Sequence, residues 1–185
     1  MRVAVYGGSF NPPHAAHGMV AAWLLWTAQV DSVWMVPVYR HAFEGTQDKA
    51  LAPFADRMAW ARAMASDVDS RIKVLDVESR LPVPSYTIDT LNHLAAEHAD
   101  HSFRLVVGAD VLDQVDGWRD WPGIQDRFPP IVVGRAGSRP LPDVPVFPGM
   151  SSTEIRDRLR RGQSVVGLVT ASVAALLAER HPWAD

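Results

Sequence analysis

The most informative segment of the chain is Gly7-Gly8-Ser9-Phe10-Asn11-Pro12-Pro13-His14-Ala15-Ala16-His17-Gly18. It follows a short apolar run, Val3-Ala4-Val5-Tyr6, which predicts a buried strand. It precedes an apolar stretch over residues 19–28 that is long enough for a helix. A helix start presents unpaired N–H groups and the positive end of its dipole to the preceding turn. The order of strand, glycine turn, two histidines and helix therefore predicts an anion-binding site.

The glycines and histidines of this stretch indicate phosphate as the anion. Gly7 and Gly8 carry no Cβ, so we expect unusual backbone dihedral angles there and a close approach to a ligand. His14 and His17 have the spacing that places two imidazoles on one side of a helix start. A helix cap and a zinc site are the alternatives, but the chain has no cysteine and no third ligand cluster stands out. The turn also lacks the glycine pattern of dinucleotide-binding sites and that of the nucleophile elbow.

The composition is that of an ordinary globular protein and argues against disorder. The chain has 185 residues, of which 48% are apolar and 21% charged, and we expect one domain over 1–185 with a C-terminal helical part from about 151. A formal net charge of −3 argues against a general nucleic-acid or membrane-surface binder. The lack of cysteine, of a signal-peptide pattern and of a long apolar span predicts a cytoplasmic protein.

Further apolar runs alternate with helical patterns along the chain. Strands are predicted at residues 33–37, 72–77, 103–108 and 130–135, with helices between them. This alternation predicts a Rossmann-like α/β fold, a doubly wound parallel sheet of about five strands with a C-terminal helical extension. Residues 136–149 are rich in glycine and proline and are interpreted as a connector, and Ser85 is a candidate N-cap for a helix over 86–98.

Several polar and aromatic residues follow the predicted strands. Asp110 comes just after the fourth strand, where an acid can accept from ribose hydroxyls, help to hold magnesium, or simply cap a helix. Trp118 offers an aromatic plane for stacking on a base or ring. The segment 38–52 is long for a loop in a compact domain, which suggests either a functional loop or a solvated excursion.

A second motif lies near the carboxyl end. Ser151-Ser152-Thr153-Glu154-Ile155-Arg156 begins with S-x-x-E, the capping-box pattern, before an apolar-periodic helix. Capping alone explains the serines. The same geometry also aims backbone N–H groups, hydroxyls and Arg156 at one place, and a guanidinium can make forked contacts to phosphate.

These two motifs carry a resemblance. GGSFNPPHAAH resembles the GG-[ST]-F-[DN]-P-x-H-x-G-H signature of the nucleotidyltransferase superfamily with the H-x-G-H motif. The late I-S-S-T-x-I-R motif of that superfamily is similar to Met150-Ser151-Ser152-Thr153-Glu154-Ile155-Arg156. Within the superfamily, the whole chain resembles the bacterial nicotinate-nucleotide adenylyltransferase family. Ser85-Tyr86-Thr87-Ile88-Asp89-Thr90-Leu91 is similar to its S-Y-T-x-x-T-L segment, Gly108-Ala109-Asp110 to its G-x-D, and Trp118 and Trp121 to its W-x-x-[WY] stretch.

The resemblance implies an activity and a set of site residues. The activity is adenylyl transfer from ATP to nicotinate mononucleotide, which gives deamido-NAD and pyrophosphate, with Mg²⁺ bound alongside ATP rather than by dedicated protein ligands. Catalytic roles are implied for His14, His17 and Arg156. The implied ATP contacts are Gly7, Gly8, Ser9, Phe10, His14, His17, Gly108, Asp110, Ser151, Ser152, Thr153 and Arg156. The implied acceptor contacts are Tyr86, Thr87, Trp118, Arg40 and Arg135.

The sequence departs from the family pattern at two places. Ala16 stands where the family has glycine, and the loop after the second strand has Arg40-His41-Ala42-Phe43 instead of a proline-histidine-lysine element, with Lys49 the nearest lysine. An adenylyltransferase with another acceptor, nicotinamide mononucleotide or phosphopantetheine, therefore stays open, as does a non-catalytic nucleotide-binding homologue. A hydrolase built on Ser9 or Ser85 has little support, because neither serine lies in a nucleophile-base pattern. The sequence indicates no oligomeric state.

Overall fold

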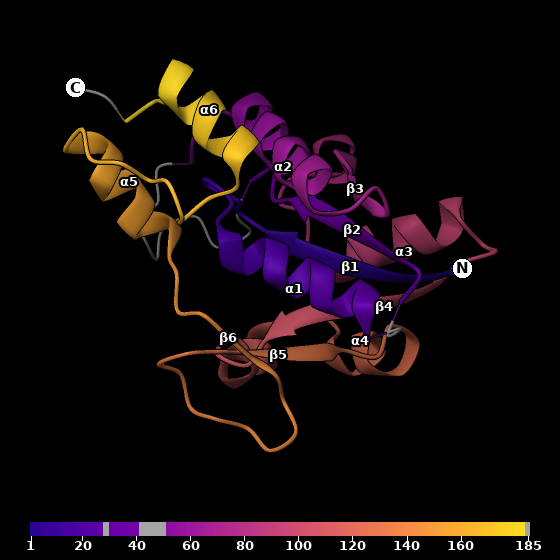
Figure 1. Cartoon of the computed structure of the whole chain (residues 1–185). Helices are drawn as coiled ribbons and strands as arrows, with labels where there is room; N and C mark the ends of the chain where they lie inside the picture. Colours follow the sequence, from indigo (N-terminus) through magenta and orange to yellow (C-terminus); the bar gives the residue numbers. More distant parts are fainter. Residues whose placement is uncertain (28–29, 41–50, 184–185) are drawn as a thin grey trace.

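A parallel sheet of six strands runs through the computed structural model, which describes residues 1–27, 30–40 and 51–183 (Figure 1). Along the sheet the order is β3-β2-β1-β4-β5-β6. The bounds are Arg2–Gly8 for β1, Ser32–Pro37 for β2, Ile72–Val74 for β3, Ser102–Gly108 for β4, Ile131–Arg135 for β5 and Val146–Phe147 for β6. In the register, Val5 lies opposite Trp34 of β2 and Leu105 of β4, so β1 is the centre of the sheet.

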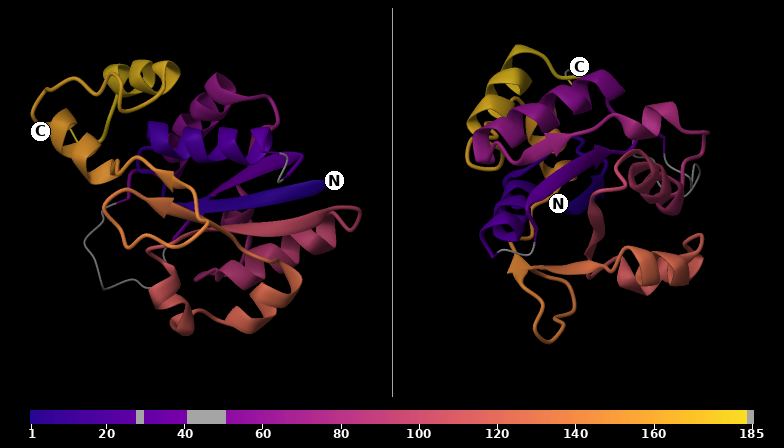
Figure 2. Two further views of the ribbon diagram at one scale, coloured as in Figure 1. Left: turned by 60° about the horizontal axis from the view of Figure 1, so that its bottom comes forward. Right: turned by 90° about the vertical axis from the view of Figure 1, so that its right-hand side faces the viewer.

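Helices cover both faces of the sheet (Figure 2). On one face lie α1 (Ala15–Trp26), α2 (Phe54–Val68) and α6 (Ala171–Glu179), and on the other lie α3 (Thr87–Glu97) and α4 (Trp121–Arg127). Two short 3₁₀ helices, η1 (Val77–Arg80) and η2 (Leu112–Gly117), follow β3 and β4. The helix α5 (Ser152–Arg160) lies beyond the end of the sheet at which β1 finishes (Figure 1). This arrangement confirms the predicted doubly wound α/β fold.

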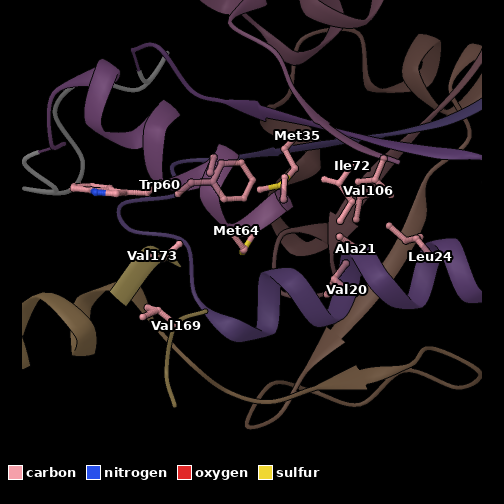
Figure 3. Packing of buried hydrophobic residues seen from close by; sticks show 14 of the residues in the cluster. Val20, Ala21, Leu24, Met35, Trp60, Met64, Ile72, Val106, Val169 and Val173 are labelled. Carbon is pink, nitrogen blue, oxygen red and sulfur yellow. The ribbon is translucent and has the colours of Figure 1, made fainter. Parts of the chain in front are cut away.

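The core explains why the central strands read as unbroken apolar runs. Successive side chains of a strand point to opposite faces, so a strand covered on both faces is apolar throughout. Along β2, Met35 packs among the residues of α1 and α2, whereas Trp34 packs with those of α3. Figure 3 shows the first of these clusters, where Met64 of α2 and Leu24 of α1 lie around Met35 and its neighbours.

Four boundaries differ from the sequence predictions. The segment 136–149 is more than a connector, because Val146 and Phe147 pair with β5 as a sixth strand. The third strand ends at Val74 rather than at residue 77, where η1 begins. The first helix begins at Ala15 instead of residue 19, because His14 takes the extended N-cap conformation. Ser85 is not the cap of α3, since Tyr86 occupies that position.

The topology places a ligand crevice at a defined point. The chain leaves β1 toward α1 on one face and leaves β4 toward the other, so the strand order reverses between these two neighbours. In open α/β sheets, ligands bind outside the carboxyl ends of the strands at such a reversal. Here the carboxyl end of β1 carries Gly7 and Gly8, and that of β4 carries Gly108.

Among the described helices, none has the length and apolar character needed to span a bilayer.

Candidate active site

A cavity of about 530 Å³ opens at the carboxyl ends of β1, β2 and β4. The end of β1 contributes Gly7 and Gly8, and the end of β4 contributes Gly108. The remaining wall includes residues after β2, before and within α3, and around η2: Val38, Arg40, Glu78, Ser85, Tyr86, Thr87, Thr90, Leu91, Val111, Gln114, Trp118 and Arg119. The cavity is therefore built from segments that are distant in sequence and that the sheet brings to one edge.

The glycine turn is shaped by Phe10 rather than by the glycines before it. Gly7 and Gly8 lie within β1, and the left-handed conformation falls on Phe10, with φ of 45°. The expectation of unusual dihedral angles at the two glycines is therefore wrong. The close approach of a ligand to these glycines stays a prediction; at Gly8 the absence of a side chain makes room for the Phe10 ring, which a Cβ would meet at 3.1 Å. A Cβ at Gly7 would meet nothing within 4 Å, so that position borders open space in the cavity wall.

His14 and His17 form a stacked pair at the start of α1. Their ring centroids are 3.7 Å apart with an interplanar angle of 22°. The His14 backbone N–H donates to Nδ1 of His17 at 3.0 Å. Because Nδ1 accepts this bond, a neutral His17 carries its proton on Nε2, which makes Nε2–H the donor left for a ligand. Phe10 packs edge-on against His17 at 5.1 Å and holds the ring in place.

Both imidazoles are neutral at pH 7. Burial, with a smaller contribution from the Arg135 charge, lowers the pKa of His14 to about 4. Burial also lowers the pKa of His17 well below 6.5, and His14 and Arg135 add to this shift. Burial, with a contribution from the Asp110 charge, raises the pKa of Tyr6. The site therefore presents neutral N–H and O–H donors beside an arginine, an arrangement suited to an anion that brings its own charge.

The second sequence motif docks directly on the first. Ser151 caps α5 by accepting from the Glu154 N–H at 3.1 Å, which confirms the predicted cap. Ser152 Oγ donates to the carbonyl of Pro12 at 2.8 Å. The buried Arg156 donates to the carbonyl of Asn11 at 2.9 Å and to Oγ1 of Thr153 at 3.1 Å. The amino-terminal and carboxyl-terminal motifs thus meet at one turn. The described residues that line the 530 Å³ cavity do not include His14, His17 or any residue of α5.

Three other candidates lie around this turn. Arg135, at the end of β5, donates to the carbonyl of Met150 at 2.7 Å, and its charge acts on both histidines. Arg135 is therefore close enough to influence His14 and His17, and it is not among the described residues that line the 530 Å³ cavity. Asp110 is exposed and folds back over Gly108, where an added Cβ would clash with its carboxylate. Gly108 lines the 530 Å³ cavity, whereas Asp110 lines a separate pocket of about 190 Å³ together with Ala109 and Asp113.

The other acceptor candidates come together in the cavity. Arg40, Tyr86, Thr87 and Trp118 all line it. The Trp118 ring packs edge-on against Trp121 at 5.8 Å. Residues 41–50, which hold most of the divergent loop with His41, Phe43 and Lys49, lie outside the described residues.

Three charged residues of this region were missed by sequence reasoning. Arg119 lies over the Tyr86 ring at 5.2 Å and pairs with Asp89 at 3.3 Å. Arg57 is 1% exposed and donates to main-chain carbonyls. Glu78 is buried in the cavity wall. Only Arg119 carried a usable signal, since it directly follows Trp118 in the predicted aromatic stretch.

Within the described ranges, no cluster of three or more His, Asp or Glu side chains could hold a metal ion. The donor groups that surround the turn are N–H, O–H and guanidinium groups, which contact phosphate oxygens rather than cations.

Comparison with known proteins identifies the family. The model of the cytidylyltransferase-like family matches residues 5–158. A curated protein named "Probable nicotinate-nucleotide adenylyltransferase" from Anaeromyxobacter sp. (strain K) is 45% identical over 96% of this chain and 94% of its own length. A protein of the same name from Myxococcus xanthus is 35% identical over 97% of this chain and 93% of its own. The solved structure of Plasmodium falciparum nicotinic acid mononucleotide adenylyltransferase complexed with NaAD has a TM-score of 0.78 at 19% identity, covering 98% of this chain and 97% of that one. The chain belongs to the cytidylyltransferase-like family and, within it, groups with the nicotinate-nucleotide adenylyltransferases.

Proposed function

We propose that this member of the nicotinate-nucleotide adenylyltransferase family transfers the adenylyl group of ATP to nicotinate mononucleotide. The phosphate oxygen of the mononucleotide attacks the α-phosphorus of ATP and forms the new P–O bond. The bond from that phosphorus to the oxygen bridging to the β-phosphorus breaks, and pyrophosphate leaves. The products are deamido-NAD and pyrophosphate, so the reaction belongs to NAD biosynthesis. No residue becomes covalently attached, so catalysis consists of positioning and charge stabilisation.

The observation that carries the proposal is the docking of α5 on the glycine turn. Ser152 and Arg156 hold the carbonyls of Pro12 and Asn11, which places the start of α5 beside His14 and His17. A helix N-terminus and a guanidinium are both suited to phosphate groups. This geometry supports one triphosphate site built from the two ends of the chain.

Each group around the turn has a role in this site. His17 would donate from Nε2 to an oxygen on the α-phosphate, and His14 would support it from the stacked position. Backbone groups of Gly7, Gly8, Ser9 and Phe10 would line the same site. The departing pyrophosphate would be held by Ser151, Ser152, Thr153 and Arg156. We assign Arg135 to this phosphate side too, because its charge acts on both histidines.

The acceptor would occupy the 530 Å³ cavity. The first N–H groups of α3 have no partner inside the helix, and they would bind the nicotinate carboxylate near Tyr86 and Thr87. A carboxylate gains more from a helix start than a neutral amide does, so nicotinate is favoured over nicotinamide. Trp118 would stack on the pyridine ring and Arg40 would face the phosphate of the mononucleotide.

A divalent ion would enter with ATP. We propose magnesium, which takes oxygen ligands, with the phosphates as its main ligands and the exposed Asp110, whose carboxylate folds toward Gly108, as an available carboxylate. Bound magnesium would neutralise part of the phosphate charge. Asp110 would also accept from the ribose hydroxyls next to Gly108.

A cytoplasmic location of the protein stays a prediction.

An acceptor panel tests this function. Purified protein is incubated with ATP, magnesium and one acceptor at a time: nicotinate mononucleotide, nicotinamide mononucleotide or phosphopantetheine. Pyrophosphate release is measured, and the nucleotide product is separated by chromatography. We expect the highest kcat/KM with nicotinate mononucleotide and equal amounts of deamido-NAD and pyrophosphate. A preference for another acceptor would reassign the substrate, and ATP binding without pyrophosphate release for any acceptor would favour a non-catalytic homologue.

A further inference from the structure

A buried carboxylate, Glu78, joins the two chain segments that form the acceptor side of the cavity. Its Oε2 accepts from the Tyr39 backbone N–H at 3.0 Å and from the Ser85 hydroxyl at 3.2 Å. Tyr39 directly precedes Arg40, and Ser85 directly precedes Tyr86 and Thr87. One carboxylate oxygen therefore links the segment after β2 to the segment before α3.

The segment after β2 is held from its other side by Arg57. The Nη1 of Arg57 donates to the carbonyl of Val38 at 2.6 Å, and its Nη2 donates to the carbonyl of Tyr39 at 3.5 Å. The same guanidinium donates to the carbonyls of Ser9 at 3.0 Å and Ala52 at 3.0 Å. Arg57 thus fixes the glycine turn and the segment after β2 relative to each other.

The two buried charges depend on one another. Burial lowers the pKa of Arg57 to about 10, while the Glu78 charge acts in the opposite direction. Burial raises the pKa of Glu78, and the Tyr39 N–H, the Ser85 hydroxyl and the Arg57 charge oppose that rise. A buried charge that has hydrogen-bond partners and an opposite charge nearby is tolerated, whereas a lone one is very costly.

We propose that Glu78, supported by Arg57, is a positioning residue for the acceptor mononucleotide: it sets the distance between Arg40 and the start of α3. This inference rests on the function proposed above. Glu78 lines the cavity, and its Oε2 accepts from two protein groups, so we assign it to holding the wall. Glu78 makes none of the contacts that hold α5 and the histidines on the ATP side. It reaches that side only indirectly, through Arg57 and the Ser9 carbonyl, so we expect its loss to act much less there.

The test compares affinities for the two substrates. Dissociation constants for nicotinate mononucleotide and for ATP are measured separately by calorimetry in the wild type and in Glu78→Ala, Glu78→Gln and Ser85→Ala variants. We expect Glu78→Ala to weaken mononucleotide binding by about tenfold or more, since bonds to a charged acceptor are lost, with ATP binding little changed. Glu78→Gln keeps an oxygen for the Tyr39 N–H and should restore most of the affinity. Ser85→Ala loses one of the two tethers and should weaken the mononucleotide alone by several-fold.

Glu97→Gln alters an exposed carboxylate on α3 outside the cavity and should leave both constants unchanged. Two results would overturn the inference. One is that Ser85→Ala weakens the binding of ATP and of the mononucleotide equally. The other is that the dissociation constant for the mononucleotide is unchanged in both Ser85→Ala and Glu78→Ala. Ser85→Ala carries the test if Glu78→Ala fails to fold. Wild-type protein that binds the mononucleotide without releasing pyrophosphate would contradict the proposed function alone, because the affinity ratios still report on Glu78.

Discussion

His17 offers one nitrogen to a ligand because its other nitrogen already accepts from the His14 backbone. Loss of one preorganised donor to a transition-state phosphate costs about 3 kcal/mol, or roughly a hundredfold in rate. We therefore expect His17→Ala to lower kcat by about that factor with little change in KM for the acceptor. Steady-state kinetics measure this, with His93→Ala as a control, since His93 pairs with Glu97 on α3 away from the cavity. Near-normal kcat in His17→Ala would rule out its role.

His14 makes the ligand-free protein sensitive to acid. The unfolded chain binds a proton at this residue near pH 6.5, but the folded protein does so only near pH 4. Between these values the unfolded state binds more protons, so the free energy of unfolding falls as the pH decreases, by up to about 1.4 kcal/mol per pH unit. We measure the free energy of unfolding in urea at pH 7 and at pH 5. The decrease between these two pH values should be smaller in His14→Gln than in the wild type. His17 acts in the same direction and remains in both proteins. An identical difference in both would contradict the burial of a neutral His14.

Single residues divide into those that the sequence could predict and those that it could not. His14, His17, Ser151 and Arg156 were predictable as a group, because motif residues at fixed spacing determine a turn and a helix start. Arg57 was not, since a charged residue in a helical pattern normally faces water. Its burial follows from carbonyls of two distant segments, at Ser9 and Val38, that converge with the nearby Ala52 carbonyl on one guanidinium, and no local pattern encodes that convergence.

The end of β1 and the turn after it give two glycines different roles. A methyl at Gly8 would lie 3.1 Å from the buried Phe10 ring, whereas one at Gly7 would meet no protein atom within 4 Å. We expect Gly8→Ala to lower the free energy of unfolding by about 1–3 kcal/mol, as other overpacked sites do. Gly7→Ala should fold normally but bind substrates more weakly, because the methyl projects into cavity space. Thermal unfolding and substrate titrations of both variants measure the contrast. Equal stability losses in the two variants would contradict it.

Among the elements, periodicity and capping predicted the central strands and α5, but not the edge of the sheet. β6 pairs only through Val146 and Phe147, which is too short for any sequence period to reveal. The location of β6 depends on its partner β5 rather than on its own residues. The start of α1 was also misplaced, because the extended conformation of His14 moves it upstream of the apolar stretch.

The segment from α6 to Trp183 packs on the helical layer of the fold, against α2. α6 contacts α2, where Asp67 accepts from the N–H of Ser172 at 2.9 Å and from its hydroxyl at 2.6 Å. Trp183 packs against Trp60 with ring centroids 5.4 Å apart. We propose that residues 1–185 form one domain, and we expect one unfolding transition that coincides by far-ultraviolet circular dichroism and by tryptophan fluorescence. An earlier fluorescence transition would indicate that the carboxyl end unfolds separately.

Across the whole molecule, the central claim is that the two ends of the chain act on the same triphosphate. A double-mutant cycle on kcat with His17→Ala and Arg156→Gln tests it, because glutamine keeps a polar N–H group at this position while removing the guanidinium charge and its second donor, which bonds Thr153. Residues that act as one unit show strongly non-additive losses. We predict that the double variant is scarcely slower than the slower single variant. Losses that multiply in the double variant would show that the two ends act independently and would contradict a shared phosphate site.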